Sequence, residues 1–121
     1  MSEYQEQAAL FAWAALQEGV YPELALMFAT LNGAQLAGGG RAWAILQRAG
    51  AKKGLPDIIL PVARGGWHGL AVELKVGENR PSQSQVEWLD RLTEQGYLAT
   101  ACWGWEDAKE TIVEYLGGSH G

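Results

Sequence analysis

The sequence predicts one α/β domain whose central mixed sheet is flanked by helices. Apolar residues make up 48% of the 121 positions and charged residues 19%, a balance typical of a folded globular protein. That length supports one sizeable core but not two. Segments with helical periodicity alternate with short apolar runs bounded by Gly and Pro. The predicted order is helix, strand, helix, strand, strand, helix, strand, helix, in one domain over residues 1–116 with a flexible tail at 117–121.

The first predicted helix covers residues 3–17. Ser2 is a suitable N-cap, and acidic side chains in the first turn suit the helix dipole. Gly19 and Pro22 then break the helix. Residues 24–31 form an apolar run that is compatible with a buried strand or a short helix, and periodicity alone does not decide between them. Asn32-Gly33 predicts a turn after it.

The glycine run at residues 38–40 is not a phosphate-binding loop, because no Gly-Lys-Ser/Thr follows it. It is better explained as a flexible entry to a helix over residues 41–49, with Trp43 and Leu46 on an apolar side. Gly50 ends that helix.

The centre of the chain predicts a hairpin. Two apolar runs, residues 54–61 and 70–76, are joined by a turn that contains Arg64-Gly65-Gly66. Side chains alternate along a strand, so Glu73 and Lys75 share one face, and Asp57 could bring a second carboxylate to it. Taken alone, a Glu-x-Lys pattern is more often a solvated pair on an edge strand than part of a functional site.

The last third predicts a helix, a strand and a helix. Ser82 and Gln85 form a capping box at the start of a helix that runs to Gln95, and Gly96 ends it. Residues 97–103 are expected to be a further buried strand. A final helix covers residues 105–116 and is acidic at its start.

Taken together, these motifs resemble a known family. Pro56-Asp57, an apolar strand, a turn and Glu73-Leu74-Lys75 resemble the PD-(D/E)xK nuclease signature. The surrounding sequence is similar to the VRR-NUC family of that superfamily, in Lys53-Gly54-Leu55-Pro56-Asp57, the Gly-Gly-Trp-His-Gly turn at 65–69, Ser82-x-x-Gln85 and Gly96-Tyr97. The likeness spans about residues 3–116. It implies a restriction-endonuclease-like αβββαβ core, with an extra helix after the first strand and a C-terminal helix, and it favours a strand for residues 24–31.

The resemblance also implies a divalent-metal-dependent endonuclease acting on DNA. It assigns catalytic roles to Glu3, Asp57, Glu73, Lys75 and Gln85, with Glu6 as the alternative to Glu3. Asp57, Glu73 and the backbone carbonyl of Leu74 would be ligands of Mg²⁺, for which Mn²⁺ could substitute. Small stand-alone members of the family, many phage-encoded, are associated with homodimers that cut branched DNA such as Holliday junctions. A less selective flap, nick or single-strand nuclease, or a non-catalytic nucleic-acid-binding module, is the alternative.

Charge is unevenly distributed along the chain. The formal net charge of −5 is unusual for a DNA-binding protein, because phosphate contacts supply much of the affinity. Residues 41–80, however, carry seven basic and three acidic side chains, and this segment contains the predicted site. The expected nucleic-acid contacts are Lys52, Lys53, Arg64, His68, Arg80 and Ser82. Solvated lysines and a turn-shaping role for His68 remain the alternatives.

Other classes of site fit the sequence poorly. One Cys and two His, with no C-x-x-C or H-E-x-x-H spacing, disfavour a zinc site. Neither His lies in a context that suggests a nucleophile pair. The apolar runs are too short for a membrane helix and the N-terminus does not resemble a signal peptide. We therefore expect a cytoplasmic protein, with Cys102 as a buried thiol.

Overall fold

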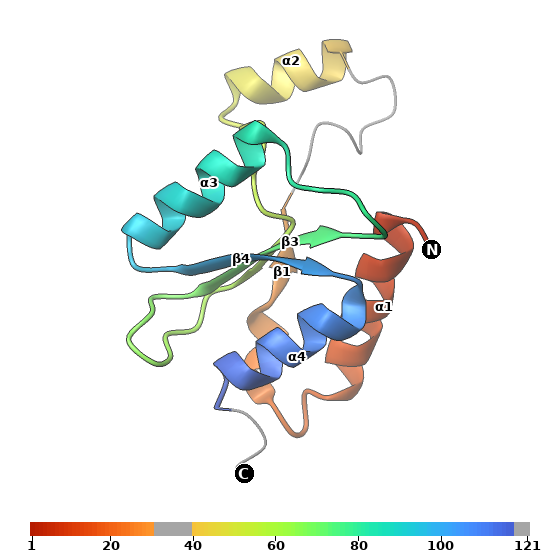
Figure 1. Cartoon of the computed structure of the whole chain (residues 1–121), viewed down its shortest axis with the longest axis vertical. Helices are drawn as coiled ribbons and strands as arrows, with labels where there is room; N and C mark the ends of the chain where they lie inside the picture. Colours follow the sequence, from red (N-terminus) through yellow and green to blue (C-terminus); the bar gives the residue numbers. More distant parts are fainter. Residues whose placement is uncertain (31–39, 118–121) are drawn as a thin grey trace.

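Four strands form a mixed sheet at the centre of the structure, a computed structural model that describes residues 1–30 and 40–117 (Figure 1). They are β1 (Phe28–Ala29), β2 (Ile58–Leu60), β3 (Leu70–Lys75) and β4 (Leu98–Trp103). Their spatial order is β1-β2-β3-β4, with β1/β2 and β2/β3 antiparallel and β3/β4 parallel. The predicted hairpin is therefore confirmed as the β2–β3 pair.

The helices cover both faces of this sheet. They are α1 (Glu3–Leu16), a short 3₁₀ helix η1 (Pro22–Leu26), α2 (Gly40–Arg48), α3 (Gln83–Glu94) and α4 (Trp105–Tyr115). Figure 1 shows α3 on one side of the sheet and α1 and α4 on the other. This order confirms the predicted αβββαβ core with an additional helix after the first strand and a C-terminal helix.

The core lies between β3 and the α1–α4 layer. Leu70, Val72 and Leu74 point to this side of β3 and join Leu10 of α1 and Ile112 of α4 in one buried cluster. Every residue of β3 is buried, because β2 and β4 flank it and helices cover both faces. Side chains on its other face, which include Glu73 and Lys75, are therefore buried as well.

Two predictions about strands need correction. Residues 24–31 are not one strand: η1 occupies the first part, because Pro22 suits the first position of a helix, and only Phe28–Ala29 pairs with β2. In β4, which was expected to be buried, only Cys102 is buried, because β4 is an edge strand. The predicted Asn32-Gly33 turn, most of the 38–40 glycine run and the tail beyond Gly117 lie outside the described residues.

The additional helix α2 packs little against the rest of the described chain. None of its residues is buried, and Ile45 is largely exposed. Figure 1 shows α2 beyond the start of α3, away from the sheet. Among the helices in the described ranges, none is both long and apolar enough to cross a membrane.

Candidate functional site

Pairing of β2 with β3 brings two carboxylates together. Ile58 pairs with Val72, so Asp57, one residue earlier, lies opposite Glu73 and on the same face. The Leu74 amide donates a hydrogen bond of 2.8 Å to Asp57 Oδ2. Asp57 is only 6% exposed and Glu73 only 1%. The predicted carboxylate pair is thus held inside the protein rather than on its surface.

Thr30 anchors the backbone that carries Asp57. Its amide donates to the Asp57 carbonyl (2.8 Å) and its hydroxyl donates to the Pro56 carbonyl (2.6 Å). None of the sequence motifs described above includes Thr30. The available signal was that Thr30 is the one polar side chain in the apolar run at residues 24–31.

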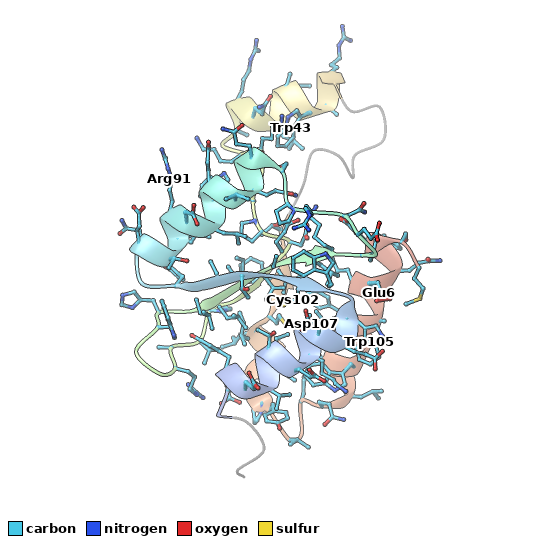
Figure 2. The ribbon with its side chains drawn as sticks, in the orientation of Figure 1. Glu6, Trp43, Arg91, Cys102, Trp105 and Asp107 are labelled. Atoms are coloured by element: carbon cyan, nitrogen blue, oxygen red, sulfur yellow. The ribbon has the colours of Figure 1, made fainter. Side chains whose placement is uncertain are left out.

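Lys75 connects the carboxylate pair to α1. Its Nζ lies 3.5 Å from Glu73 Oε2 and 3.8 Å from Glu3 Oε2. Glu6, one turn along α1, instead accepts a hydrogen bond from the Trp105 amide (3.1 Å), at the start of α4 (Figure 2). The sequence left open whether Glu3 or Glu6 is the catalytic acidic residue of α1. Glu3 is the one whose carboxylate reaches the site.

Gln85 performs two functions with one side chain. Its Oε1 accepts from the Ser82 amide (2.7 Å), while Ser82 Oγ accepts from the Gln85 amide (3.3 Å), which confirms the predicted capping box. Its Nε2 donates to Glu73 Oε2 at 2.9 Å. Glu73 Oε2 is also the oxygen that Lys75 Nζ approaches, at 3.5 Å. The start of α3 thereby orients one carboxylate of the site.

The family resemblance implies that Glu73 is a metal ligand of a metal-dependent nuclease. On that expectation, Gln85→Glu should reduce cleavage roughly 10- to 100-fold, the usual cost of losing a group that orients a metal ligand. The new carboxylate can still accept from Ser82, but it cannot donate to Glu73 and would repel it. A single-turnover cleavage rate measures this effect. The matched control is Gln5→Glu, since Gln5 has the same capping position in α1 and accepts from Ser2. Equal losses in both variants would contradict a specific role for the contact with Glu73.

Burial makes the carboxylate pair hard to ionise. It raises the pKa of Glu73 to about 8, and the neighbouring Asp57 carboxylate adds to the rise, although Lys75 acts in the opposite direction. Burial also raises the pKa of Asp57, against the hydrogen bond from the Leu74 amide. Without a cation beyond Lys75, the pair therefore tends to retain a proton near neutral pH.

One oxygen of this pair has no partner. Glu73 Oε1 is buried and accepts no hydrogen bond from any residue in the described ranges. Native proteins rarely leave a buried polar atom in that condition without a function or a bound ion. Two buried carboxylates with a free oxygen match the hard oxygen ligands that Mg²⁺ prefers. The residues present therefore fit a divalent metal.

Protein carboxylates alone would not complete such a site. Within the described parts of the chain, no group of three or more His, Cys, Asp or Glu side chains could hold a metal. Carbonyl oxygens and water would have to supply the remaining ligands, as is common for Mg²⁺. The predicted ligand role of the Leu74 carbonyl remains a prediction.

Four of the expected nucleic-acid contacts lie around α3 and the loop before it. Lys53 and Ser82 line one hollow of about 340 Å³ with Ser84 of α3. Lys52 lines a neighbouring hollow of about 370 Å³. Arg80 lies in the loop between β3 and α3. Their contact with nucleic acid stays a prediction.

Arg64 and His68 lie elsewhere. Both belong to the β2–β3 connection, at the opposite end of β3 from Glu73 and Lys75. Arg64 forms an ion pair with Glu23. The His68 ring packs edge-on against Tyr97, 5.9 Å between centroids, and lies against Gly96, where an added Cβ would come within 2.5 Å of it. This geometry favours the turn-shaping role of His68, and the structure does not bring either residue to the carboxylates.

Comparison with known proteins agrees with this geometry. The family model for the VRR-NUC domain matches residues 1–105. A solved structure described as a VRR_NUC domain protein is 26% identical, with a TM-score of 0.82, over 98% of this chain and 92% of that one. No curated protein matches the chain.

Proposed function

This chain belongs to the VRR-NUC family, a nuclease-type domain, and we propose that it is a divalent-metal-dependent endonuclease that hydrolyses phosphodiester bonds in DNA. The observation that carries the proposal is the buried Asp57–Glu73 pair with its unpartnered Glu73 Oε1. Burying two carboxylates side by side costs stability unless a cation compensates them. Such an arrangement is expected where the compensating cation is itself the catalytic metal ion.

Asp57, Glu73 and the Leu74 carbonyl are the proposed ligands of Mg²⁺, with Mn²⁺ able to substitute. When bound, such an ion neutralises charge on the phosphate and lowers the pKa of a coordinated water. This is the chemistry that phosphodiester hydrolysis requires. The other polar side chains of the site, Lys75, Gln85 and Glu3, surround the Asp57–Glu73 pair, and a role is proposed for each below.

Lys75 is proposed to orient the attacking water or to stabilise charge on a phosphate oxygen. Its ammonium group is drawn toward Glu73 and Glu3 at 3.5 and 3.8 Å, so its position is restrained before substrate arrives. Gln85 holds Glu73 through its amide and leaves the opposite oxygen, Oε1, free. Glu3 acts mainly by positioning Lys75.

We propose branched DNA as the substrate and a homodimer as the active form. In such a dimer, two sites related by symmetry could make paired cuts. The poorly packed helix α2, with Ile45 exposed, is the proposed contact with a second copy. A flap, nick or single-strand nuclease and a non-catalytic binding module are the competing functions.

A panel of end-labelled substrates tests the proposal: a four-way junction, a flap, a nicked duplex, an intact duplex and a single strand. Each is incubated with Mg²⁺, Mn²⁺ or EDTA. We expect cleavage with either metal, none in EDTA, and the fastest cutting of the junction. Cleavage in EDTA would contradict the metal mechanism, and junction binding without cleavage in every condition would indicate a binding module.

Light scattering tests the dimer separately. A mass near twice 13.1 kDa is expected. A monomer that still resolves junctions by paired cuts would contradict the proposed role of symmetry.

A further inference from the structure

An exposed tryptophan lies next to the carboxylate site. Trp103 is the last residue of β4, and its register partner across the parallel β3–β4 pair is Lys75. Neighbouring strands lie about 4.8 Å apart, and residues in register project to the same face. The indole therefore emerges on the same face as Lys75, whose ammonium is 3.5 Å from Glu73.

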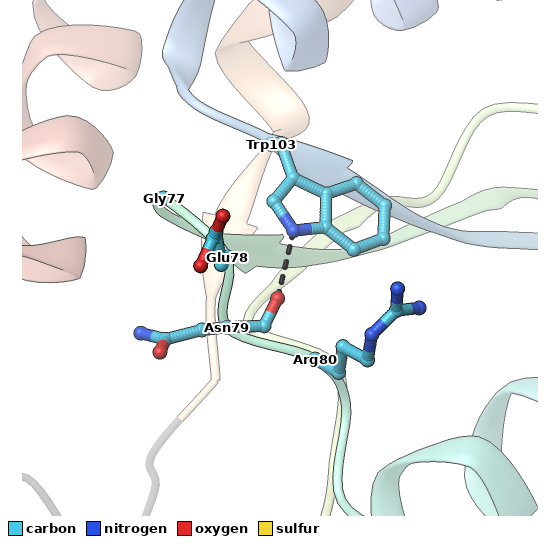
Figure 3. Close-up of a pocket in the computed structure, with 5 residues that line it drawn as sticks. All are labelled: Gly77, Glu78, Asn79, Arg80 and Trp103. Atoms are coloured by element: carbon cyan, nitrogen blue, oxygen red, sulfur yellow. Dashed lines mark hydrogen bonds between the residues drawn. The ribbon is translucent and has the colours of Figure 1, made fainter.

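The orientation of this indole is restrained although its surface is not covered. Trp103 is 42% exposed. Its Nε1 donates a hydrogen bond of 2.8 Å to the Asn79 carbonyl, in the loop that follows β3 (Figure 3). The polar atom of the ring is thus satisfied by the protein. What remains available is aromatic surface, the part of Trp that stacks on other rings.

This tryptophan forms one wall of a cavity of about 490 Å³. The other walls are the four loop residues Gly77, Glu78, Asn79 and Arg80. The volume falls within the range of about 300–1,000 Å³ that is common for small-ligand sites. Figure 3 shows the Arg80 side chain running beside the indole.

The charges of the cavity favour an uncharged ring over a free anion. Glu78 places a carboxylate at one wall, which would repel a phosphate bound there alone. Arg80 supplies a guanidinium, and within the described ranges it takes part in no ion pair. A nucleotide suits both charges. Its neutral base is not repelled by the Glu78 carboxylate, and its phosphate, on one side of the base, can contact the Arg80 guanidinium.

We infer that Trp103 is a stacking platform for an unpaired nucleobase next to the phosphate that is cut, with Arg80 contacting the adjoining backbone. This inference deepens the proposed nuclease function and rests on it for the identity of the nearby phosphate. A base inside an intact duplex is stacked on both sides and cannot reach the indole. Stacking on Trp103 therefore selects strands with an unstacked base, such as those at junction centres, flaps and gaps.

Equilibrium binding in EDTA tests the platform without any cleavage. The probes are a fluorescein-labelled single-stranded 12-mer, the same strand in a blunt duplex, and the same strand with abasic sites in place of its bases. Anisotropy titrations compare the wild type with Trp103→Ala and Trp103→Phe. Loss of one base–aromatic stack is expected to weaken single-strand binding roughly 5- to 150-fold in Trp103→Ala.

Three further results are expected. Trp103→Phe retains most of the affinity, because it keeps a ring although it loses the hydrogen bond to Asn79. Binding of the blunt duplex stays within about twofold. On the abasic strand, Trp103→Ala lowers the binding affinity little, because the base that would stack on the indole is already missing.

Phe28→Ala is the matched control. Phe28 is also an exposed aromatic residue of an edge strand, 49% exposed, but β1 is at the opposite edge of the sheet. The Phe28→Ala variant should bind all three probes with the affinity of the wild type. Thermal unfolding of each variant shows whether the fold is retained.

Several outcomes would overturn the inference. They are failure of the wild type to bind the single strand, unchanged binding in Trp103→Ala, equal losses in Trp103→Ala and Trp103→Phe, and equal losses on the normal and abasic strands. Because these titrations contain no metal, they remain decisive even if the substrate panel detects no nuclease activity.

Discussion

Asp57→Asn and Glu73→Gln are each expected to lower Mg²⁺-dependent cleavage by on the order of 10³-fold or more. A metal ion supplies several kcal/mol of transition-state stabilisation, and each ~1.4 kcal/mol is worth a factor of ten. Both substitutions keep the side-chain shape. In Asp57→Asn, the oxygen of the new side-chain amide can still accept from the Leu74 amide, so the loss should come from the missing charge and not from unfolding.

Single-turnover rates on the best substrate of the panel measure this effect, with circular dichroism to verify the fold. The matched control is Asp90→Asn, which makes the same chemical change at an exposed position of α3. It should cleave at close to the wild-type rate. Cleavage by Asp57→Asn at the wild-type rate would contradict a catalytic role for the carboxylate pair.

In EDTA, the free energy of unfolding is expected to fall as the pH rises from about 5 to about 8. In the folded protein, Glu73 holds its proton until its raised pKa of about 8, whereas in the unfolded chain it loses that proton near 4.5. Between these values the folded state binds more protons, so each pH unit costs up to about 1.4 kcal/mol of stability. The raised pKa of Asp57 acts in the same direction. Above about pH 8 the contribution of Glu73 becomes constant.

Urea unfolding at pH 5, 6, 7 and 8 measures this slope. In Glu73→Gln the side chain at position 73 has no proton to lose, so the free energy of unfolding should change less with pH over this range. The variant should also be more stable than the wild type at pH 8. Excess Mg²⁺ should reduce the wild-type decline, because a bound cation favours the ionised pair. An equal slope in the wild type and Glu73→Gln would show that other groups cause the pH dependence.

Local signals predicted much of the fold and part of the site. Ser2 and the Ser82/Gln85 capping box marked helix starts correctly, because a cap depends on residues within one turn. Alternation along a strand placed Glu73 and Lys75 on one face. Prediction failed at residues 24–31, where apolar content did not distinguish the 3₁₀ helix η1 from a strand.

The order of elements, the helix starts at Ser2 and Ser82, and the residues of the carboxylate–lysine motif can all be predicted from the sequence. Three relations are visible only in the folded chain: the burial of Asp57 and Glu73, the anchoring of Asp57 by Thr30, and the contact of Gln85 with Glu73. The position of Trp103 beside Lys75 is a fourth. All four depend on strand register and helix packing between segments 12 to 28 residues apart, which local sequence patterns do not encode. Periodicity reports which face a side chain occupies, but not which distant segment covers that face.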